Sequence, residues 1–301
     1  MSKTALVFGG QGSQYSGMGL ELFEKYPVVS DIYGVLGENL KEISFHGEIE
    51  EISKTENLQP IMVAFQLSTI KLLEKEIKID ATCGLSLGEY SALVASGVID
   101  NKDAIELVKS RGMEMQKASD SIESAMVAVL NASEEYLREI VEKDTLKGKV
   151  FIANINSSKQ IVISGEKESI EKLRDILKAD GIKAIHLKVS GAFHTPFMES
   201  ANLNYVKSLQ KVDFKEPKLD YYPNLTGEKY AGEKMVELLC KQIVSPVLLF
   251  KTLKNMVDDG VDKFIEIGPG NVISSIIKKE FKDVTVETLK NDKEIINYIE
   301  R

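Results

Sequence analysis

Ser86 stands between two glycines in the stretch GLSLGEYSALVASG, which contains the motif G-x-S-x-G. This motif is typical of a nucleophilic serine when a strand precedes it and a helix follows, because the glycines allow a sharp turn that exposes the hydroxyl group. The stretch IDATCG before the motif is typical of a short strand, and an apolar helical pattern follows it. The backbone N–H after the serine can then face an oxyanion. The pattern therefore predicts a nucleophile, although a purely structural turn fits it as well.

A serine nucleophile needs a base at neutral pH, and the chain offers three histidines. His46 lies among carboxylates in SFHGEIEEIS, and His186 alternates with apolar residues in a predicted strand, so both are interpreted as structural or surface residues. His194 lies in SGAFHTPFM, an irregular apolar segment between a glycine and a proline, and is the best candidate base. No aspartate follows in an obvious position to complete a triad. The sequence therefore predicts a Ser–His dyad, with His194 oriented by a backbone carbonyl group.

Arg111 is the third candidate for a functional residue. In NKDAIELVKSRGMEMQ it falls on the apolar face of a predicted helix that also carries Leu107 and Val108. A guanidinium group directed inward has to be paired, because burying an unpaired charge is costly. The partner is either a structural Asp or Glu or the carboxylate of a substrate, held in a bidentate pair. In the second case we expect Arg111 to face a cleft open to water, so that its removal costs the protein little stability.

A glycine-rich stretch, FGGQGSQYSGMG, follows the first predicted strand and superficially resembles a phosphate-binding turn. It does not match G-x-G-x-x-G, since Tyr15 occupies the place of the third glycine, and no G-K-[ST] follows. A dinucleotide site is therefore not expected, and a plain loop is the simplest interpretation. Gln11 nevertheless lies at the end of the strand, where open α/β sheets place groups that contact ligands.

The elements that position these residues alternate between strand and helix. TALVFGG is typical of a short buried strand, and residues Pro60 to Glu76 are typical of a helix with proline in its first turn. This alternation predicts a large α/β-hydrolase-like domain with a mostly parallel sheet. Residues 125–189 differ, because they give the order strand, helix, strand, strand, helix, strand of a ferredoxin-like domain. We therefore expect residues 125–189 to be inserted into a large domain made of residues 1–124 and 190–301.

The composition is that of an ordinary globular protein, with 43% hydrophobic and 28% charged residues among 301. The net charge of -8 comes from interleaved acidic and basic residues, which argues against nucleic acid as the main partner. No apolar run approaches the roughly 20 residues needed to span a bilayer, and the N-terminal stretch is too short in its apolar part to be a secretory signal. Two cysteines without CxxC spacing predict no disulfide framework and no metal site, and they favour a cytoplasmic location.

Six stretches of the chain, in order, resemble the malonyl-CoA:acyl carrier protein transacylases of fatty-acid synthesis. They are GQGSQ, GLSLGEYSALVASG, SRGMEMQ, GAFHTPFM, KQIVSPV and FIEIGPGNV, and the similarity covers essentially the whole chain, including the inserted domain. The resemblance implies a ping-pong transfer in which Ser86 takes the malonyl group from malonyl-CoA. The group then passes to the phosphopantetheine thiol of acyl carrier protein, without any cofactor besides the coenzyme A thioester that is the substrate.

The resemblance also implies a role for each candidate residue. His194 would be the general acid and base, and Arg111 would hold the malonyl carboxylate. Gln11 and the backbone N–H of Leu87 would donate hydrogen bonds to the oxyanion. Gln242, in KQIVSPV, would supply the carbonyl group that orients His194, which fits the missing aspartate.

Three further positions bear on the choice of acyl group. Phe193 resembles the position that crowds the α-carbon of the acyl chain in malonyl-selective members of the family. Leu85 stands where the family usually has histidine, and Gly9 stands where FPGQGSQ would have proline. Neither departure removes the nucleophile or the base, so the expected effect is on the rate or on acyl selectivity.

Three other functions fit parts of the sequence. A serine hydrolase or thioesterase would use the same turn to deliver acyl groups to water, although the inward arginine and the missing acidic triad member favour transfer. An acyltransferase that serves a polyketide synthase would carry the same motifs. A non-catalytic binding module would keep the fold, but the presence of Ser86, His194, Arg111 and Gln11 together argues against it.

Overall fold

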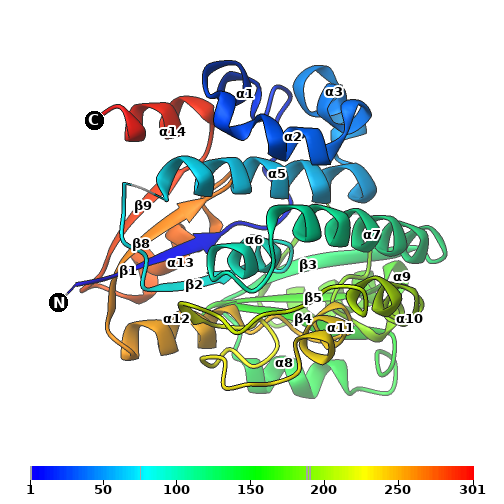
Figure 1. The fold of residues 1–301 in the computed structure, drawn as a ribbon. Helices are drawn as coiled ribbons and strands as arrows, with labels where there is room; N and C mark the ends of the chain where they lie inside the picture. Colours follow the sequence, from blue (N-terminus) through cyan, green and yellow to red (C-terminus); the bar gives the residue numbers. More distant parts are fainter. Residues whose placement is uncertain (1, 75, 188, 190) are drawn as a thin grey trace.

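The computed structural model describes residues 2–74, 76–187, 189 and 191–301, and these residues form two β-sheets surrounded by helices (Figure 1). Sheet A has the strand order β7-β2-β1-β8-β9, and every neighbouring pair in it is parallel. Its strands are β1 (Lys3–Phe8), β2 (Ala81–Gly84), β7 (Asp220–Tyr221), β8 (Val261–Ile267) and β9 (Thr285–Leu289). The predicted α/β fold with a parallel sheet is confirmed.

Helices occupy most of the chain between these strands. The α-helices that flank sheet A in the sequence are α1 (Leu20–Lys25), α2 (Ser30–Leu36), α3 (Glu38–His46), α4 (Ile49–Ile52), α5 (Thr55–Leu73), α6 (Gly88–Ala95), α7 (Asn101–Asp120), α10 (Glu199–Leu209), α11 (Met235–Val244), α12 (Leu249–Asp258), α13 (Val272–Glu280) and α14 (Asp292–Ile299). Short 3-10 helices add η1 (Pro27–Val29) and η2 (Pro196–Met198). Figure 1 shows α5 and α7 packed side by side over the sheets.

The strand β1 lies at the centre of sheet A and is buried on both faces, which is why its sequence ends in the apolar run ALVF. Successive side chains of a strand point to opposite faces. Leu6 and Phe8 pack into a core that also contains residues of α5, α6 and α7. Ala5 and Val7 pack into a second core that contains residues of α12 and α13. Helices on both faces therefore hold the ends of the parallel strands in fixed positions.

Helix α5 begins at Thr55, so the prediction that it starts with Pro60 in its first turn is wrong. Pro60 lies inside the helix, and the helix ends at Leu73 rather than at Glu76. The start is stabilised from a distance, because Gln116 Oε1 of α7 accepts a hydrogen bond from the Thr55 N–H at 2.9 Å. A tertiary contact of this kind leaves no local signal in the sequence.

Sheet B lies between α7 and α10 in the sequence and has the order β4-β5-β3-β6 with antiparallel pairs. Its elements are β3 (Ser124–Leu130), α8 (Glu134–Val141), β4 (Val150–Ser157), β5 (Gln160–Glu166), α9 (Lys167–Ala179) and β6 (Lys183–His186). The predicted succession of strands and helices is confirmed. Ser190, at which the second segment of the large domain was predicted to begin, lies outside the described residues.

The strand β3 separates two apolar environments. Val127 and Val129 pack into a core with residues of α8 and α9. Met126 and Ala128 point to the opposite face and belong to the large core shared with sheet A. Sheet B is also joined to the chain after α11, because the backbone of Val247 pairs with that of β4 through two hydrogen bonds of 2.9 Å. One face of sheet B is therefore held against the sheet A unit.

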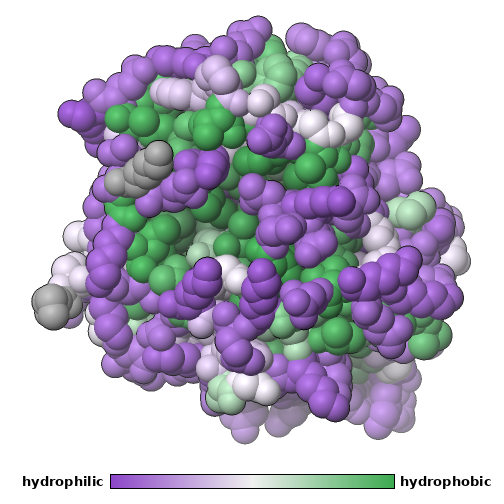
Figure 2. All heavy atoms as spheres, in the orientation of Figure 1, coloured by the Kyte–Doolittle hydropathy of each residue, from purple (hydrophilic) through white to green (hydrophobic). Residues whose placement is uncertain are grey.

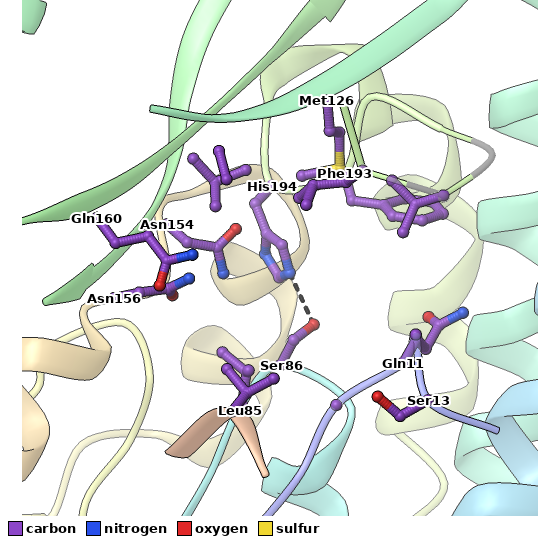
Figure 3. A pocket seen from close by; sticks show the side chains of 17 residues that line it. Gln11, Ser13, Leu85, Ser86, Met126, Asn154, Asn156, Gln160, Phe193 and His194 are labelled. Atoms are coloured by element: carbon purple, nitrogen blue, oxygen red, sulfur yellow. Dashed lines mark hydrogen bonds between the residues drawn. The ribbon is translucent and has the colours of Figure 1, made fainter. Parts of the chain in front are cut away.

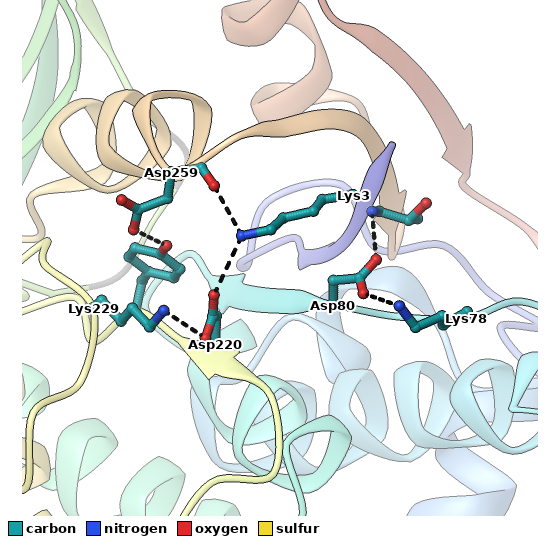
Figure 4. A network of polar contacts seen from close by, with 8 residues as sticks. Lys3, Lys78, Asp80, Asp220, Lys229 and Asp259 are labelled. Atoms are coloured by element: carbon teal, nitrogen blue, oxygen red, sulfur yellow. Dashed lines mark hydrogen bonds and ion pairs between the residues drawn. The ribbon is translucent and has the colours of Figure 1, made fainter. Parts of the chain in front are cut away.

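The amino ends of the sheet A strands are joined by ion pairs near the surface (Figure 4). Asp80, just before β2, pairs with Lys78 at 2.6 Å and accepts a hydrogen bond from a backbone N–H of β1 at 3.1 Å. Asp220, the first residue of β7, pairs with Lys229 at 2.7 Å and with Lys3 at 3.9 Å. This ion-pair network links β1, β2 and β7 at the end where these strands begin.

The surface view in Figure 2 shows hydrophilic residues over most of the rim, with hydrophobic residues visible between them. Among the described residues, no helix combines the length and the apolar character needed to cross a bilayer. The two cysteines, Cys83 and Cys240, are not joined in a disulfide.

Candidate active site

Ser86 occupies the sharp turn between β2 and α6, where its φ is 53°. A positive φ in a residue with a side chain costs of order 1–3 kcal/mol, and such residues cluster at active sites. Gly84 and Gly88 make the turn possible for a different reason. A Cβ atom on Gly84 would overlap the backbone of Gly88, and one on Gly88 would overlap the carbonyl group of Phe8. The glycines of the motif thus permit close backbone packing that places Ser86 at the carboxyl end of β2.

Ser86 Oγ lies 2.7 Å from His194 Nε2, although the two residues are 108 positions apart in the chain. His194 Nδ1 lies 2.9 Å from the backbone carbonyl oxygen of Gln242. Because a carbonyl oxygen only accepts hydrogen bonds, Nδ1 carries the proton and Nε2 is left to accept one from the serine hydroxyl. The φ of His194 is 60°, so its backbone is strained like that of Ser86.

The environment of His194 favours a neutral imidazole. Burial lowers its pKa to about 4, and the positive charge of Arg111 acts in the same direction. The hydrogen bond to the Gln242 carbonyl opposes this shift. At neutral pH the ring is therefore in the form that can take a proton from Ser86.

The other two histidines lie away from this pair. His46 is the last residue of α3 and is exposed. His186 lies in β6, is exposed, and pairs with Glu171 at 2.8 Å. The described residues that line the cavity at Ser86 include neither of them. Of the three candidate bases, the fold brings only His194 to Ser86.

Arg111 reaches Ser86 from α7, and its side chain is fully buried, with 0% exposure. Its Nη2 donates to Ser86 Oγ at 3.2 Å and to Gln242 Oε1 at 2.9 Å. Its Nη1 donates to Gln59 Oε1 at 2.9 Å. The guanidinium carbon lies 5.6 Å from the centroid of the Tyr90 ring, within the range of a cation–π contact.

The expectation that Arg111 faces a cleft open to water is therefore wrong. Gln59, Gln242 and Tyr90 come from three other helices and enclose the guanidinium group, which the pattern of α7 alone could not reveal. Among the residues that the structure describes, the acceptors that Arg111 contacts are all neutral, so no structural Asp or Glu there holds it directly. A buried cation with only neutral acceptors beside a nucleophile is well placed to attract an anionic group.

Gln11 and Leu87 occupy the loop after β1 and the start of α6. Gln11 Oε1 accepts a hydrogen bond from Gln59 Nε2 at 3.3 Å, which leaves the amide nitrogen of Gln11 as a donor. Leu87 is the N-cap of α6, where backbone N–H groups lack partners within the helix. The N–H of Ser86 itself donates to Asn224 Oδ1 at 2.6 Å and is already used.

Ser86 and His194 open into a cavity of about 270 Å³ whose walls come from both sheets. Figure 3 shows the pair near the centre, with Gln11 on one side and three amide side chains of sheet B on the other. The residues of the cavity wall are Gly10, Gln11, Gly12, Ser13, Leu85, Ser86, Met126, Ala128, Asn154, Asn156, Gln160, Val162, Leu187, Val189, Phe193, His194 and Val272. Phe193 lies beside His194 in this wall and is 6% exposed. The cavity is mostly apolar, with polar groups on opposite sides.

Several residues of the site escaped sequence reasoning. Asn224 follows β7 and contacts Ser86 across 138 positions, and no local pattern marks it. Gln59 offered a signal, because it is a polar residue in the apolar stretch LQPIMVAF of a buried helix. Asn154 and Asn156 are two positions apart in β4, so they could have been recognised as two polar side chains on one face of a strand.

Comparisons with known proteins agree over nearly the whole chain. Residues 5–296 match the family model described as acyl transferase domain. A curated relative from Bacillus subtilis (strain 168), named malonyl CoA-acyl carrier protein transacylase, is 38% identical over 287 residues, which is 93% of this chain and 90% of that protein. A crystal structure of the transacylase of that name from Clostridium perfringens has a TM-score of 0.93 and 37% identity, covering 99% of this chain and 96% of that one.

A third similar structure is the complex of a type II PKS acyl-carrier protein with its malonyl-transacylase. It has a TM-score of 0.91 and 33% identity, covering 99% of this chain and 99% of that chain. These relatives are similar to the chain in sequence, and the two structures also in fold, over nearly its whole length. The chain belongs to the acyl transferase domain family and, within it, to the malonyl CoA-acyl carrier protein transacylases.

Proposed function

We propose that this enzyme transfers a malonyl group from malonyl-CoA to the phosphopantetheine thiol of acyl carrier protein in fatty-acid synthesis, through a malonyl-Ser86 intermediate. The observation that carries the proposal is the position of Arg111 Nη2, 3.2 Å from the nucleophile Ser86 Oγ, because an acyl group that ends in a carboxylate needs a cation there. The name of the Bacillus subtilis relative supports the same donor and acceptor. The complex of a malonyl-transacylase with its carrier protein supports the partner.

In the first half of the reaction, His194 Nε2 takes the proton of the Ser86 hydroxyl as Oγ attacks the thioester carbonyl carbon of malonyl-CoA. The tetrahedral intermediate carries a negative charge on the former carbonyl oxygen. When it collapses, the carbon–sulfur bond breaks, and His194 returns the proton to the departing coenzyme A sulfur. The malonyl group is left as an ester on Ser86.

In the second half, His194 takes the proton of the phosphopantetheine thiol, and the sulfur attacks the ester carbonyl of malonyl-Ser86. A second tetrahedral intermediate forms and collapses with loss of the Ser86 oxygen, which recovers its proton from His194. The enzyme returns to its starting state. The carbonyl of Gln242 keeps Nε2 directed at the reacting groups in both halves, since it holds the opposite ring nitrogen at 2.9 Å.

Gln11 and the backbone N–H of Leu87 are proposed as the donors to the oxyanion. The amide oxygen of Gln11 accepts a hydrogen bond from Gln59, which leaves the amide nitrogen of Gln11 as the group that can donate. Leu87 adds a backbone N–H from the N-cap position of α6, where the helix dipole also favours negative charge. Removing one such donor typically slows the reaction by about 10²–10³-fold.

Arg111 is proposed to hold the malonyl carboxylate, and Phe193 to limit substitution at the α-carbon. The malonyl carboxylate would replace neutral amide acceptors of the Arg111 guanidinium group and form a stronger pair of opposite charges with it. Phe193 lines the cavity together with His194. One extra methyl group in such a pocket is worth about 1–3 kcal/mol, so methylmalonyl-CoA should be a poor substrate without being excluded.

We assign residues 1–124 and 190–301 to an α/β-hydrolase-like domain and residues 125–189 to an inserted ferredoxin-like domain. The antiparallel order β4-β5-β3-β6 and the separate core of sheet B support this division. We further propose that the enzyme works in the cytoplasm, with free Cys83 and Cys240, and uses no metal or cofactor.

Intact mass after brief incubation with malonyl-CoA tests the proposal directly. The wild-type protein should gain one malonyl group on the peptide containing GLSLGEY, and Ser86→Ala should gain none while keeping its circular dichroism spectrum. Addition of holo acyl carrier protein should remove the group from the enzyme and place it on the carrier. An adduct on another residue, or release of free malonate at the same rate without the carrier, would contradict transfer through Ser86.

A further inference from the structure

Glu89 is a buried carboxyl group directly behind the nucleophile and has no part in the steps above. It lies in the first turn of α6, three positions after Ser86, and is 1% exposed. A buried charge is retained only where hydrogen bonds and a counter-charge compensate it. The surroundings of Glu89 therefore indicate what it does.

Three donors converge on the Glu89 carboxyl group. Oε1 accepts hydrogen bonds from the Tyr221 hydroxyl at 2.5 Å and from the Asn224 N–H at 3.0 Å. Oε2 accepts one from Gln242 Nε2 at 2.6 Å. Burial raises the pKa of Glu89, whereas these donors and the charge of Arg111 oppose the rise. The two N–H donors, one at each oxygen, and the nearby charge of Arg111 favour the carboxylate form.

The contact with Glu89 fixes which way the Gln242 amide points. Gln242 Nε2 lies between two acceptors, Glu89 Oε2 and the Ser86 carbonyl oxygen at 2.9 Å. Its Oε1 faces Arg111, which can only donate. Reversing the amide would place donors against donors at Arg111 and acceptors against acceptors at Ser86. The Gln242 amide therefore links the Glu89 carboxylate to the guanidinium group of Arg111 through one hydrogen bond on each side.

Glu89 also acts on the backbone of the nucleophile through Asn224. The Asn224 N–H is held by Glu89, and its side chain accepts the Ser86 N–H at 2.6 Å and donates to the Gly84 carbonyl at 2.5 Å. The N–H of Ser86 is thus bound by Asn224 and its carbonyl oxygen by Gln242, and Glu89 accepts a hydrogen bond from both of these residues. These hydrogen bonds help to hold the strained turn at Ser86, where φ is 53°.

We propose that Glu89 is a positioning residue, whose carboxylate balances the buried charge of Arg111 through the Gln242 amide and thereby aims the guanidinium at the acyl carboxylate. The inference rests on the proposed function, since it gives Arg111 its substrate. Glu89 acts through Gln242 and Asn224, and among the described residues its carboxyl group accepts hydrogen bonds only from Tyr221, Asn224 and Gln242.

A double-mutant cycle in thermal unfolding, measured without substrate, tests the charge relay. Glu89→Gln should lower the melting temperature, because it leaves the Arg111 charge buried without compensation. Introduced into an Arg111→Met background, the same change should lower it far less, or raise it. If Glu89→Gln alone fails to fold, the double variant should recover a cooperative transition. Equal losses in both backgrounds, or a double variant that also fails to fold, would overturn the relay.

Acylation rates test whether Glu89 orients the guanidinium group of Arg111 toward the acyl carboxylate. In Glu89→Gln, the ratio of malonyl-CoA to acetyl-CoA acylation should fall about tenfold, the size expected for a weakened charge-assisted hydrogen bond. The matched control is Glu266→Gln. Glu266 is also a buried glutamate, 1% exposed, but it accepts N–H groups at the start of α13 and not from the site.

The control should lower the melting temperature and leave the malonyl to acetyl ratio unchanged. A ratio that is unchanged in Glu89→Gln, or that falls equally in Glu266→Gln, would overturn the positioning role. A failure of the proposed function is distinguishable, because the wild-type protein would then show no malonyl adduct on Ser86. The unfolding cycle needs no substrate and would still report whether Glu89 and Arg111 are coupled.

Discussion

At the amino ends of sheet A, Lys229 forms an ion pair with Asp220, and their side chains are 49% and 28% exposed, respectively. At the carboxyl ends, Arg111 is completely buried and its direct acceptors are neutral. Exposed pairs are screened by water and salt and contribute about 0–1 kcal/mol each. A buried cation cannot be screened, so each of its partners matters. The first arrangement ties strands together, and the second creates a site that attracts charge.

The two ends also differ in backbone strain. Ser86 and His194 both have positive φ, and both lie in the region beyond the carboxyl ends of the strands. The surrounding glycines and hydrogen bonds hold these conformations against their cost. Replacing polar residues should consequently have large effects on activity at the carboxyl end of sheet A. At the amino end it should have only small effects on stability.

The largest expected effect at the carboxyl end, after loss of the nucleophile, is that of His194→Ala. It should slow acylation by malonyl-CoA by about 10²–10⁴-fold, the range for a positioned acid and base. Stopped-flow or quench-flow acylation provides the measurement. His46→Ala and His186→Ala serve as controls, because both histidines are exposed and distant from Ser86. A large loss in either control, in folded protein, would mean that the base is misassigned.

Arg111→Ala should reduce malonyl transfer by roughly 10²-fold or more, since each 1.4 kcal/mol is tenfold in rate. Acetyl transfer should stay the same or improve, because a neutral acyl group does not need the cation. Specificity constants for the two thioesters give the comparison.

The melting temperature of Arg111→Ala should also fall, because a fully buried side chain leaves a cavity and unpaired amides. Stability loss is thus expected whatever the role of Arg111, and the selectivity change is the diagnostic result. Equal losses of malonyl and acetyl transfer would assign the residue a structural role.

The pH dependence of acylation should reflect the lowered pKa of His194, about 4. A base with the ordinary pKa of about 6.5 would lose roughly tenfold in rate at pH 5.5, whereas His194 should lose almost none. The acylation rate between pH 7 and pH 5, measured in folded protein, checks this. A midpoint near 6.5 would show that the imidazole is solvated in the working enzyme.

The same shift predicts a stability change. The unfolded chain protonates this histidine near 6.5 and the folded chain only near 4, so the folded state loses stability as the pH falls between these values. Above 6.5 both states are neutral and the contribution is constant. In His194→Gln, this part of the pH dependence should disappear from urea-unfolding curves.

The smallest effect is expected at the amino ends. Lys229→Ala removes the partner of Asp220 and should lower the free energy of unfolding by about 0–1 kcal/mol, and less at high salt. Acylation rates should not change, because Asp220 lies at the amino end of β7 whereas Ser86 follows the carboxyl end of the parallel strand β2. A loss of several kcal/mol, or of activity, would remove the distinction between the two ends of the sheet.

The sequence revealed the parts of the site that depend on local pattern. The G-x-S-x-G turn and the inward face that carries Arg111 both follow from residues close together in the chain. The neutral partners that enclose Arg111 did not follow from the sequence, because Gln59 and Gln242 come from other helices. The partners that decide polar burial are set by tertiary packing, which local periodicity does not encode.

The start of α5 teaches the same point on a smaller scale. Proline at the first turn of a helix is a good general rule, but Pro60 lies inside α5. The helix extends back to Thr55 because Gln116, far along the chain, caps it. Asn224 likewise has no motif and is found only when β7 is placed beside β2.

The contact between Ser86 and His194 closes a loop of 108 positions that contains the whole of sheet B. Closing such a loop costs conformational entropy, and contacts of this sequence separation form late when a chain folds. During refolding, helices should therefore appear before the dyad does. The regain of acylation would time the docking of sheet B against sheet A, whereas circular dichroism would time only the earlier formation of helices.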